Sequence, residues 1–283
     1  MKNMNTMTLL AAGTCAMIAA SAANAAVYYS TNFGTGYNPG ALAGTNNVAN
    51  EEGQNGWKQT GTVTATAPAV PVLNAIQVSG GAALVGTSGQ DVYRAFDSNA
   101  SAVAGTTLYV SASIKVTAAQ AGGDYFMFVG QPSGTTSNFY GRLFAKSTSG
   151  GMLLGIQSTS GTGSAVTYGT AVLSLNQTYN VVYAYDFVSG SLNDTFTMYI
   201  DPTSTNRASL TSYVSAGWLS TTGSEPTQLT EIGLRQGSSG NAPTVSVYSL
   251  AAGSSLADVG VVPAPGAIAL LGVAGLVGSR RRR

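Results

Sequence analysis

Residues 108–117 read LYVSASIKVT and carry the clearest pattern in this chain. Every second residue is apolar, and the residues between them are polar or amphipathic. Strict alternation of this kind indicates a β-strand with one face in a hydrophobic core and the other in water. The apolar set is Leu108, Val110, Ala112, Ile114 and Val116. This stretch therefore predicts a fold built from strands.

Neighbouring stretches extend the prediction. The run YFMFV at 125–129 is apolar on both faces, which is typical of a strand in the middle of a sheet. Residues 179–188 and 195–200 form a strand pair joined by SGSLND, whose Gly, Asn and Asp favour a hairpin loop. Shorter strands are expected at 27–33, 60–66, 74–78, 82–85, 92–96, 141–145, 152–157, 230–234 and 245–250, with irregular excursions at 34–56 and 210–223.

The composition agrees with this pattern. Charged residues make up only 8% of the chain and hydrophobic residues 44%, so a core can form and the composition of a disordered chain is excluded. No stretch has the apolar stripe of a helix of three turns. We therefore expect an all-β protein with a single antiparallel β-sandwich, a jelly roll, over residues 26–258.

The first 25 residues have the features of a secretory signal peptide. Lys2 gives a positive start, residues 9–20 are an apolar core, and Ala23 and Ala25 supply the small residues that signal peptidase accepts. We expect a helix in this segment and cleavage after Ala25. A transmembrane helix fits less well because the apolar run is short. The one cysteine, Cys15, lies in this segment, so the processed chain would have no disulfide.

Residues 259–283 form a second export signal. An apolar segment at 267–279 follows VVPAPG and ends in Arg280, Arg281, Arg282 and Arg283. A short apolar run closed by fixed positive charge favours a short transmembrane helix that acts as an anchor or a processing signal. Because positive charge stays in the cytoplasm, the body is expected outside the inner membrane.

Several kinds of chemistry are excluded by composition. The chain has no histidine and no cysteine outside the signal peptide, which removes His-based catalysis, thiolate chemistry and zinc clusters. No glycine-rich phosphate loop is present, and no cofactor is expected. Residues 26–262 carry seven bases and eleven carboxylates, a net charge of −4, which argues against nucleic-acid binding.

Carboxylates remain as the only catalytic groups. A glycosidase needs two of them about 5–10 Å apart, but Glu51 and Glu52 are the only close neighbours and would point to opposite faces of a strand. The sequence therefore predicts no catalytic residue. Asp186, Asn193 and Asp194 flank one loop and are a weak calcium candidate. A turn stabilised by hydrogen bonds from these side chains is the favoured alternative.

Carbohydrate binding would use aromatic side chains as flat stacking platforms. The candidates are Trp57, Tyr125, Tyr140 and Trp218. The alternative for each is a place in the core or over its edge, and the sequence does not separate the two.

The tail resembles the PEP-CTERM sorting signal of bacterial envelope proteins. The resemblance rests on the motif residues Val262, Pro263, Ala264, Pro265 and Gly266, the apolar segment 267–279 and the arginine cluster. Ala264 stands where the name-giving motif has Glu. The resemblance implies a membrane anchor and processing by an exosortase-type enzyme.

The body is similar to the concanavalin A-like or laminin-G-like jelly roll. The residues that carry the similarity are GQNGW at 53–57, GQDVYRAF at 89–96, residues 183–202 and EIGLRQG at 231–237. Members of this superfamily include lectins, glycosidases and adhesion modules. We therefore expect a non-catalytic cell-surface or matrix protein that makes adhesive or carbohydrate contacts, with polysaccharide as a partner. A glycan-active enzyme (glycosidase or lyase) and a purely structural envelope protein are the alternatives.

Overall fold

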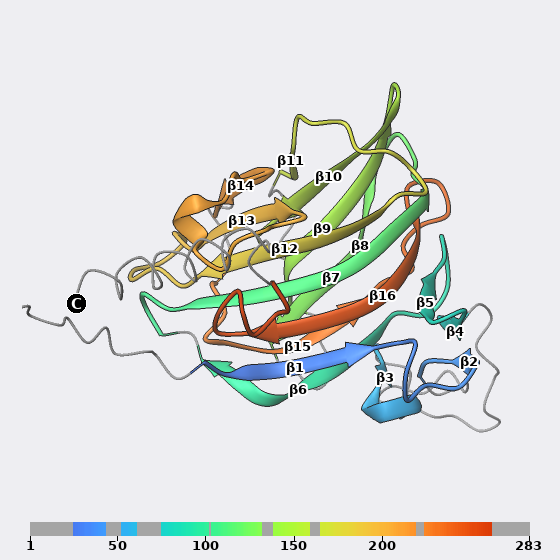
Figure 1. Cartoon of the computed structure of the whole chain (residues 1–283), viewed down its shortest axis with the longest axis horizontal. Coiled ribbons are helices and arrows are strands. Elements are labelled where there is room, and N and C mark those ends of the chain that lie inside the picture. Colours follow the sequence, from blue (N-terminus) through green and yellow to red (C-terminus); the bar gives the residue numbers. More distant parts are fainter. Residues whose placement is uncertain are drawn as a thin grey trace, which may run out of the picture.

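The computed structural model describes residues 25–43, 52–60, 75–101, 103–131, 138–158, 165–218 and 224–261. Within these residues the chain forms an antiparallel β-sandwich of two sheets (Figure 1), which confirms the all-β prediction. The only helices described are two 3₁₀ turns, η1 (Gln54–Gly56) and η2 (Arg207–Ser209). No helix in the described ranges is long and apolar enough to span a membrane.

The two segments expected to act as export signals fall largely outside these ranges. Residues 1–24, with Ala23 and the expected signal-peptide helix, lie outside the described residues, as do 262–283 with the sorting motif, the apolar segment and the arginines. The body itself ends later than expected. Val259 and Val261 are buried against Val182 and Leu256, so the folded part extends at least to Val261 rather than ending at Asp258.

The first sheet has nine strands within the described residues. Its order is β14-β13-β12-β7-β16-β5-β4-β2, and β1 also pairs with β16. Its strands are β1 (Val27–Asn32), β2 (Gly40–Ala41), β4 (Gln77–Ser79), β5 (Ala82–Val85), β7 (Thr107–Ala118), β12 (Thr178–Asp186), β13 (Thr195–Ile200), β14 (Val214–Gly217) and β16 (Thr244–Gly253).

The second sheet has seven strands within the described residues, in the order β11-β10-β9-β8-β15-β6-β3. Its strands are β3 (Lys58–Gln59), β6 (Val92–Ser101), β8 (Asp124–Gln131), β9 (Asn138–Thr148), β10 (Gly151–Gln157), β11 (Thr167–Tyr168) and β15 (Gln228–Leu234). The central strand β8 lies between β9 and β15, as the run YFMFV predicted.

The alternation at 108–117 sets the orientation of β7. The five apolar residues are each at most 2% exposed, and the polar residues between them are only partly buried. They meet the inward face of the other sheet in one large core. Burial of each large apolar side chain stabilises the fold by about 1.5–3 kcal/mol, which compensates for the missing disulfides.

The irregular excursion expected at 210–223 differs from the structure, whereas the strand expected at 60–66 is not tested by it. The excursion at 210–223 contains strand β14, which pairs with β13 between Val214–Met198 and Gly217–Thr195. The sequence of β14, VSAG, consists mainly of small residues and is too short to show the apolar–polar alternation by which a strand is recognised. The strand expected at 60–66 lies outside the described residues apart from Thr60, which follows β3.

Candidate functional site

Three of the four predicted platform residues are inside the sandwich. Trp57 is fully buried, with its ring 6.0 Å from that of Phe33, and its Nε1 donates a hydrogen bond to the Tyr37 hydroxyl at 3.1 Å. Tyr140 and Trp218 are also buried and lie with ring centroids 6.2 Å apart. An exposed stacking role is therefore wrong for these three, because large rings gain more by filling the core.

Tyr125 is also buried, at 8% exposed, and so offers no open ring for stacking, but it differs from the other three in lying on the outer side of the seven-stranded sheet. Its neighbours in β8, Phe126 and Met127, belong to the main core, whereas Tyr125 packs with Phe128, Phe139 and Phe144 in a separate cluster. Tyr93 and Tyr168 border this cluster and are half-buried. We call these six residues the aromatic face: Tyr93, Tyr125, Phe128, Phe139, Phe144 and Tyr168.

Glycines in the strands let these side chains lie flat on the sheet. A Cβ on Gly233 of β15 would stand 2.0 Å from the ring of Phe128. A Cβ on Gly130 of β8 would stand 2.2 Å from Oε1 of Glu231. Real Cβ atoms do not approach other atoms so closely, so a side chain at Gly233 would displace the rigid Phe128 ring, whereas one at Gly130 would displace the more flexible Glu231 side chain.

Basic side chains stack on the aromatic face. The guanidinium carbons of Arg142 and Arg235 lie 4.6 Å and 4.1 Å from the centroid of the Tyr125 ring. Nζ of Lys146 lies 4.0 Å from the centroid of Tyr168. Arg142 also donates to Oε1 of Gln157 at 3.3 Å. The face thus combines flat rings with several hydrogen-bond donors.

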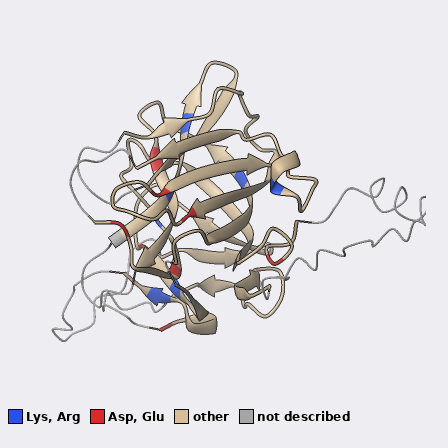
Figure 2. Ribbon diagram, turned by 90° about the vertical axis from the view of Figure 1, so that its left-hand side faces the viewer, with Lys and Arg blue, Asp and Glu red and all other residues tan. Residues whose placement is uncertain are grey.

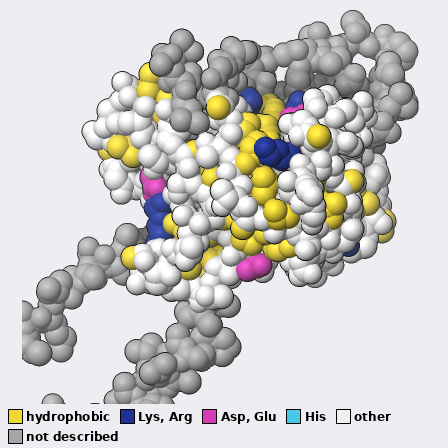
Figure 3. All heavy atoms as spheres, turned by 90° about the horizontal axis from the view of Figure 1, so that it is seen from above, with side chains coloured by type: hydrophobic (Ala, Val, Ile, Leu, Met, Phe, Trp, Pro, Cys, Tyr) yellow, Lys and Arg dark blue, Asp and Glu magenta, His cyan; other side chains and the backbone are white. Residues whose placement is uncertain are grey.

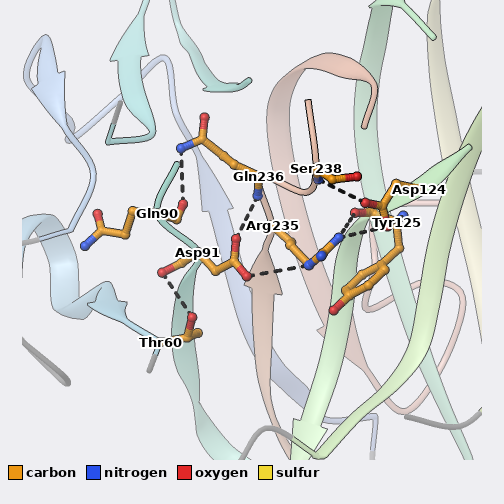
Figure 4. A network of polar contacts seen from close by, with 8 residues as sticks. All are labelled: Thr60, Gln90, Asp91, Asp124, Tyr125, Arg235, Gln236 and Ser238. Atoms are coloured by element: carbon orange, nitrogen blue, oxygen red, sulfur yellow. Dashed lines mark hydrogen bonds and ion pairs between the residues drawn. The ribbon is translucent and has the colours of Figure 1, made fainter. Parts of the chain in front are cut away.

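Arg235 fixes one edge of the aromatic face (Figure 4). Its Nη1 donates to Asp124 at 2.8 Å, and its Nε lies 3.6 Å from Asp91. The backbone N–H groups of Gln236 and Ser238 donate to the same two carboxylates, at 2.9 Å and 3.3 Å. These contacts join the end of β15 to the starts of β6 and β8.

The two carboxylates do not share Arg235 equally. Burial raises the pKa of Asp91 to about 6, and neither Arg235 nor the Gln236 N–H compensates fully. The longer distance from Asp91 to the guanidinium explains this result, because Asp124 makes the shorter, charge-assisted hydrogen bond.

Glu231 is a carboxylate that the sequence did not single out. It lies half-buried on the same side as Gly233 and Arg235, and burial raises its pKa to about 7. Among the described residues it forms no ion pair. The alternation in EIGLR, with Ile232 and Leu234 inside, is the sequence signal that could have placed it on the outer face.

The calcium candidates already have protein partners. Asp186 binds Arg207 through both carboxylate oxygens, and buried Asp194 accepts hydrogen bonds from the Tyr185 hydroxyl at 2.7 Å and Val188 N–H at 2.8 Å. Asn193 donates to the Ser189 carbonyl at 2.7 Å. The described part of the chain contains no group of three or more His, Cys, Asp or Glu that could hold a metal ion.

Over the described residues, the rest of the surface carries little charge. Lys, Arg, Asp and Glu are sparse along the ribbon and do not gather into a patch of one sign in the view of Figure 2. Seen from above, hydrophobic side chains surround a basic side chain near the middle of that surface (Figure 3). In the described part of the chain, the large hydrophobic residues that are well exposed are Val27, Leu84, Val103, Val172 and Val188.

Comparisons with known proteins identify no family. No family model matches the chain, and no curated protein matches it. Among solved structures, the chain is similar to the globular domain of T. cruzi calreticulin (11% identity, TM-score 0.42, covering 83% of this chain and 90% of that chain). It is also similar to the CBM2 module of the evolved Dit protein of Lactobacillus casei BL23 phage J-1 (11%, TM-score 0.41, covering 82% and 96%).

A third similar structure is domain 4 of AbnA, an extracellular arabinanase from Geobacillus stearothermophilus, in complex with arabinotriose (11% identity, TM-score 0.40, covering 82% of this chain and 93% of that chain). At such identities and TM-scores, these likenesses carry no argument about ligand or activity. What this protein can bind has to be argued from its own side chains.

Proposed function

We propose that this protein is an exported, non-catalytic surface or matrix protein whose β-sandwich, of the jelly-roll type, binds polysaccharide through the aromatic face. The signal peptide would direct export across the inner membrane. The tail would hold the protein there until an exosortase-type enzyme releases it to the cell surface or matrix.

The observation that carries the proposal is the aromatic face itself. A sugar ring presents apolar C–H groups on one side and hydroxyls around its edge. Tyr93 and Tyr168 offer half-buried rings at the rim, and Lys146, Arg142 and Glu231 offer polar groups beside them. A few oriented polar groups among apolar ones are the usual make-up of a small-molecule site.

The position of the chain ends supports this use of the face. Strand β1 pairs with β16 of the nine-stranded sheet, and the turn after β16 packs against that sheet through Leu256, Val259 and Val261, so the described ends lie on the layer opposite the aromatic face (Figure 1). A body anchored through its C-terminal tail would therefore keep the aromatic face open to a polymer.

A glycan array with two matched variants tests the proposal. Tyr168→Ala removes a ring that lies under Lys146 on the aromatic face, and Tyr248→Ala removes a ring that lies under Lys115 on the other sheet. Both tyrosines are half-buried, so the expected loss of packing is similar. We expect Tyr168→Ala to lower the affinity for the bound glycans by about tenfold and Tyr248→Ala to leave that affinity unchanged.

Equal binding by both variants would place the ligand elsewhere. No binding by the unchanged protein to any polysaccharide would favour the structural alternative.

Glu231 supports the enzymatic alternative as a second candidate. A carboxyl group with a pKa of about 7 can act as a general acid near neutral pH. Polysaccharide cleavage that disappears in Glu231→Gln, while glycan binding persists, would support an enzyme and overturn the non-catalytic proposal.

A further inference from the structure

The first residue after the expected signal cleavage, Ala26, is bound by the turn that follows β16. We call residues 254–261 the end turn. The Ala26 N–H donates to Oγ of Ser254 at 2.9 Å, and the Ser254 N–H donates to the Ala26 carbonyl at 3.0 Å. The body therefore fixes Ala26 in place, while the preceding residue, Ala25, is exposed.

A carboxylate lies one hydrogen bond further on. Oγ of Ser254, which accepts from Ala26, donates to Oδ2 of Asp258 at 3.1 Å. A Cβ on Gly253 would stand 2.5 Å from Cβ of Asp258 and 3.1 Å from the Ala26 carbonyl oxygen, so both groups border the same glycine. Because both atoms contact Oγ of Ser254, the distance from the Ala26 nitrogen to Oδ2 of Asp258 is at most the sum of these two hydrogen-bond distances.

Asp258 has no basic partner in the described part of the chain. Asp258 does interact electrostatically with the start of β1. The pKa of Tyr28 is raised mainly by burial and to a smaller extent by the negative charge of Asp258. The backbone N–H of Asp258 donates to Oγ of Ser255 at 3.2 Å, which holds the residue in the turn. This half-buried carboxylate also borders a surface hollow of about 680 Å³, so water and small reagents can reach it.

Cleavage after Ala25 would change the chemistry of the Ala26 nitrogen. In the uncut chain this atom is an amide with one hydrogen to donate. In the cut chain it becomes an α-ammonium group, with a positive charge and three hydrogens. An opposite charge within about 4–6 Å favours the charged form of such a group.

We propose that Ser254 and Asp258 form a binding site for the α-ammonium group of the chain's own processed N-terminus. Removal of the signal peptide then creates an ion pair that fastens the start of β1 to the end turn. Because Leu256, Val259 and Val261 pack this turn against Val182, the same ion pair also secures the last described residues before the sorting tail. The inference rests on the cleavage position expected under the proposed function.

The test uses processed protein purified from the envelope, whose first residue is identified by mass spectrometry. The rate of reaction with an N-terminus-selective aldehyde is measured against pH, which gives the pKa of the α-amino group. We expect a value about 0.5–1 unit above the ordinary 7.7–8.0. Asp258→Asn should return it to the ordinary range, and Ser254→Ala should lower it by a smaller amount.

Glu52→Gln serves as the matched control. It removes one carboxylate whose side chain is 62% exposed and which pairs with Lys58, away from the end turn, so it should leave this pKa unchanged. Thermal unfolding gives a second readout. Since a raised pKa of an amine stabilises the fold only below that pKa, Asp258→Asn should lower Tm at pH 6 and leave it unchanged at pH 10.

An α-amino pKa that is the same in the unchanged protein and in Asp258→Asn would overturn the inference. A first residue other than Ala26 would overturn both the inference and the expected cleavage position. Neither result would alter the outcome of the glycan array, so a failure of this site and a failure of the carbohydrate proposal are distinguishable.

Discussion

The guanidinium of Arg207 binds the carboxylate of Asp186 through two parallel hydrogen bonds, Nη1 to Oδ1 at 2.5 Å and Nη2 to Oδ2 at 2.6 Å. Nε of Arg207 donates to the Tyr199 hydroxyl at 3.0 Å. Burial opposes ionisation of Asp186, but the hydrogen bonds from Arg207 and Thr107 hold the pKa of Asp186 below its usual value. The pair joins η2 to the last residue of β12, so it is structural.

We expect Arg207→Met to lower the free energy of unfolding by about 1–3 kcal/mol, because it leaves a partly buried carboxylate without its cation. Since the pKa of Asp186 is depressed in the fold, the contribution is present above the ordinary value of 3.8 and is lost as pH falls below it. Urea unfolding of both proteins at pH 7 and pH 3 measures the loss of unfolding free energy and its dependence on pH. Lys58→Met, which removes an exposed pair at 3.9 Å, should change stability by less than about 0.5 kcal/mol. Equal effects of the two changes would contradict this role.

Glu231→Gln should stabilise the protein at neutral pH. Burial raises the pKa of Glu231 from 4.5 to about 7, so ionisation costs stability progressively as pH rises from 4.5 to 7. The amide avoids that cost. We expect the variant to gain about 1–3 kcal/mol at pH 8 and little at pH 4.5. Chemical denaturation at the two pH values measures the gain, and a gain that did not depend on pH would show that the carboxyl group is not desolvated.

Gly233→Ala should disturb the aromatic face. Its Cβ would stand 2.0 Å from the Phe128 ring, so the ring or the strand must move, which costs about 1–3 kcal/mol. Gly217→Ala in β14 is the matched control, because a Cβ there meets nothing within 4 Å. Thermal unfolding compares the two variants. If Gly233→Ala were as stable as Gly217→Ala, the outer face would be loosely packed and a poor platform for a ligand.

The tail should be removed in the mature protein. The apolar segment 267–279 is short for a permanent span of about 20 residues, and it resembles a sorting signal. We expect envelope-derived protein to end near Pro265. Intact-mass measurement checks this, and a chain that still ended at Arg283 would show that the anchor is retained.

The sequence by itself determined the fold class and the orientation of its best strand. Alternation at 108–117 placed Ile114 in the core and Lys115 outside, because in a strand successive side chains point to opposite faces. Low charge and frequent turn residues predicted the remaining strands. These features of the sequence left the ends of the strands uncertain and did not predict β14, since short strands of small residues carry almost no periodic signal.

Only the tertiary structure decided what the aromatic and acidic residues do. Trp57 and Tyr125 are both candidate platforms in the sequence, yet Trp57 fills the core and Tyr125 lies on the outer side of the seven-stranded sheet, because that outcome depends on which side of the sheet each side chain takes in the folded protein. Asp186 likewise pairs with Arg207, and Ala26 with Ser254, across long stretches of chain. The burial of Glu231 also depends on the strands packed around it. Local pattern fixes which face of a strand is apolar, whereas strand order fixes which side chains meet across it.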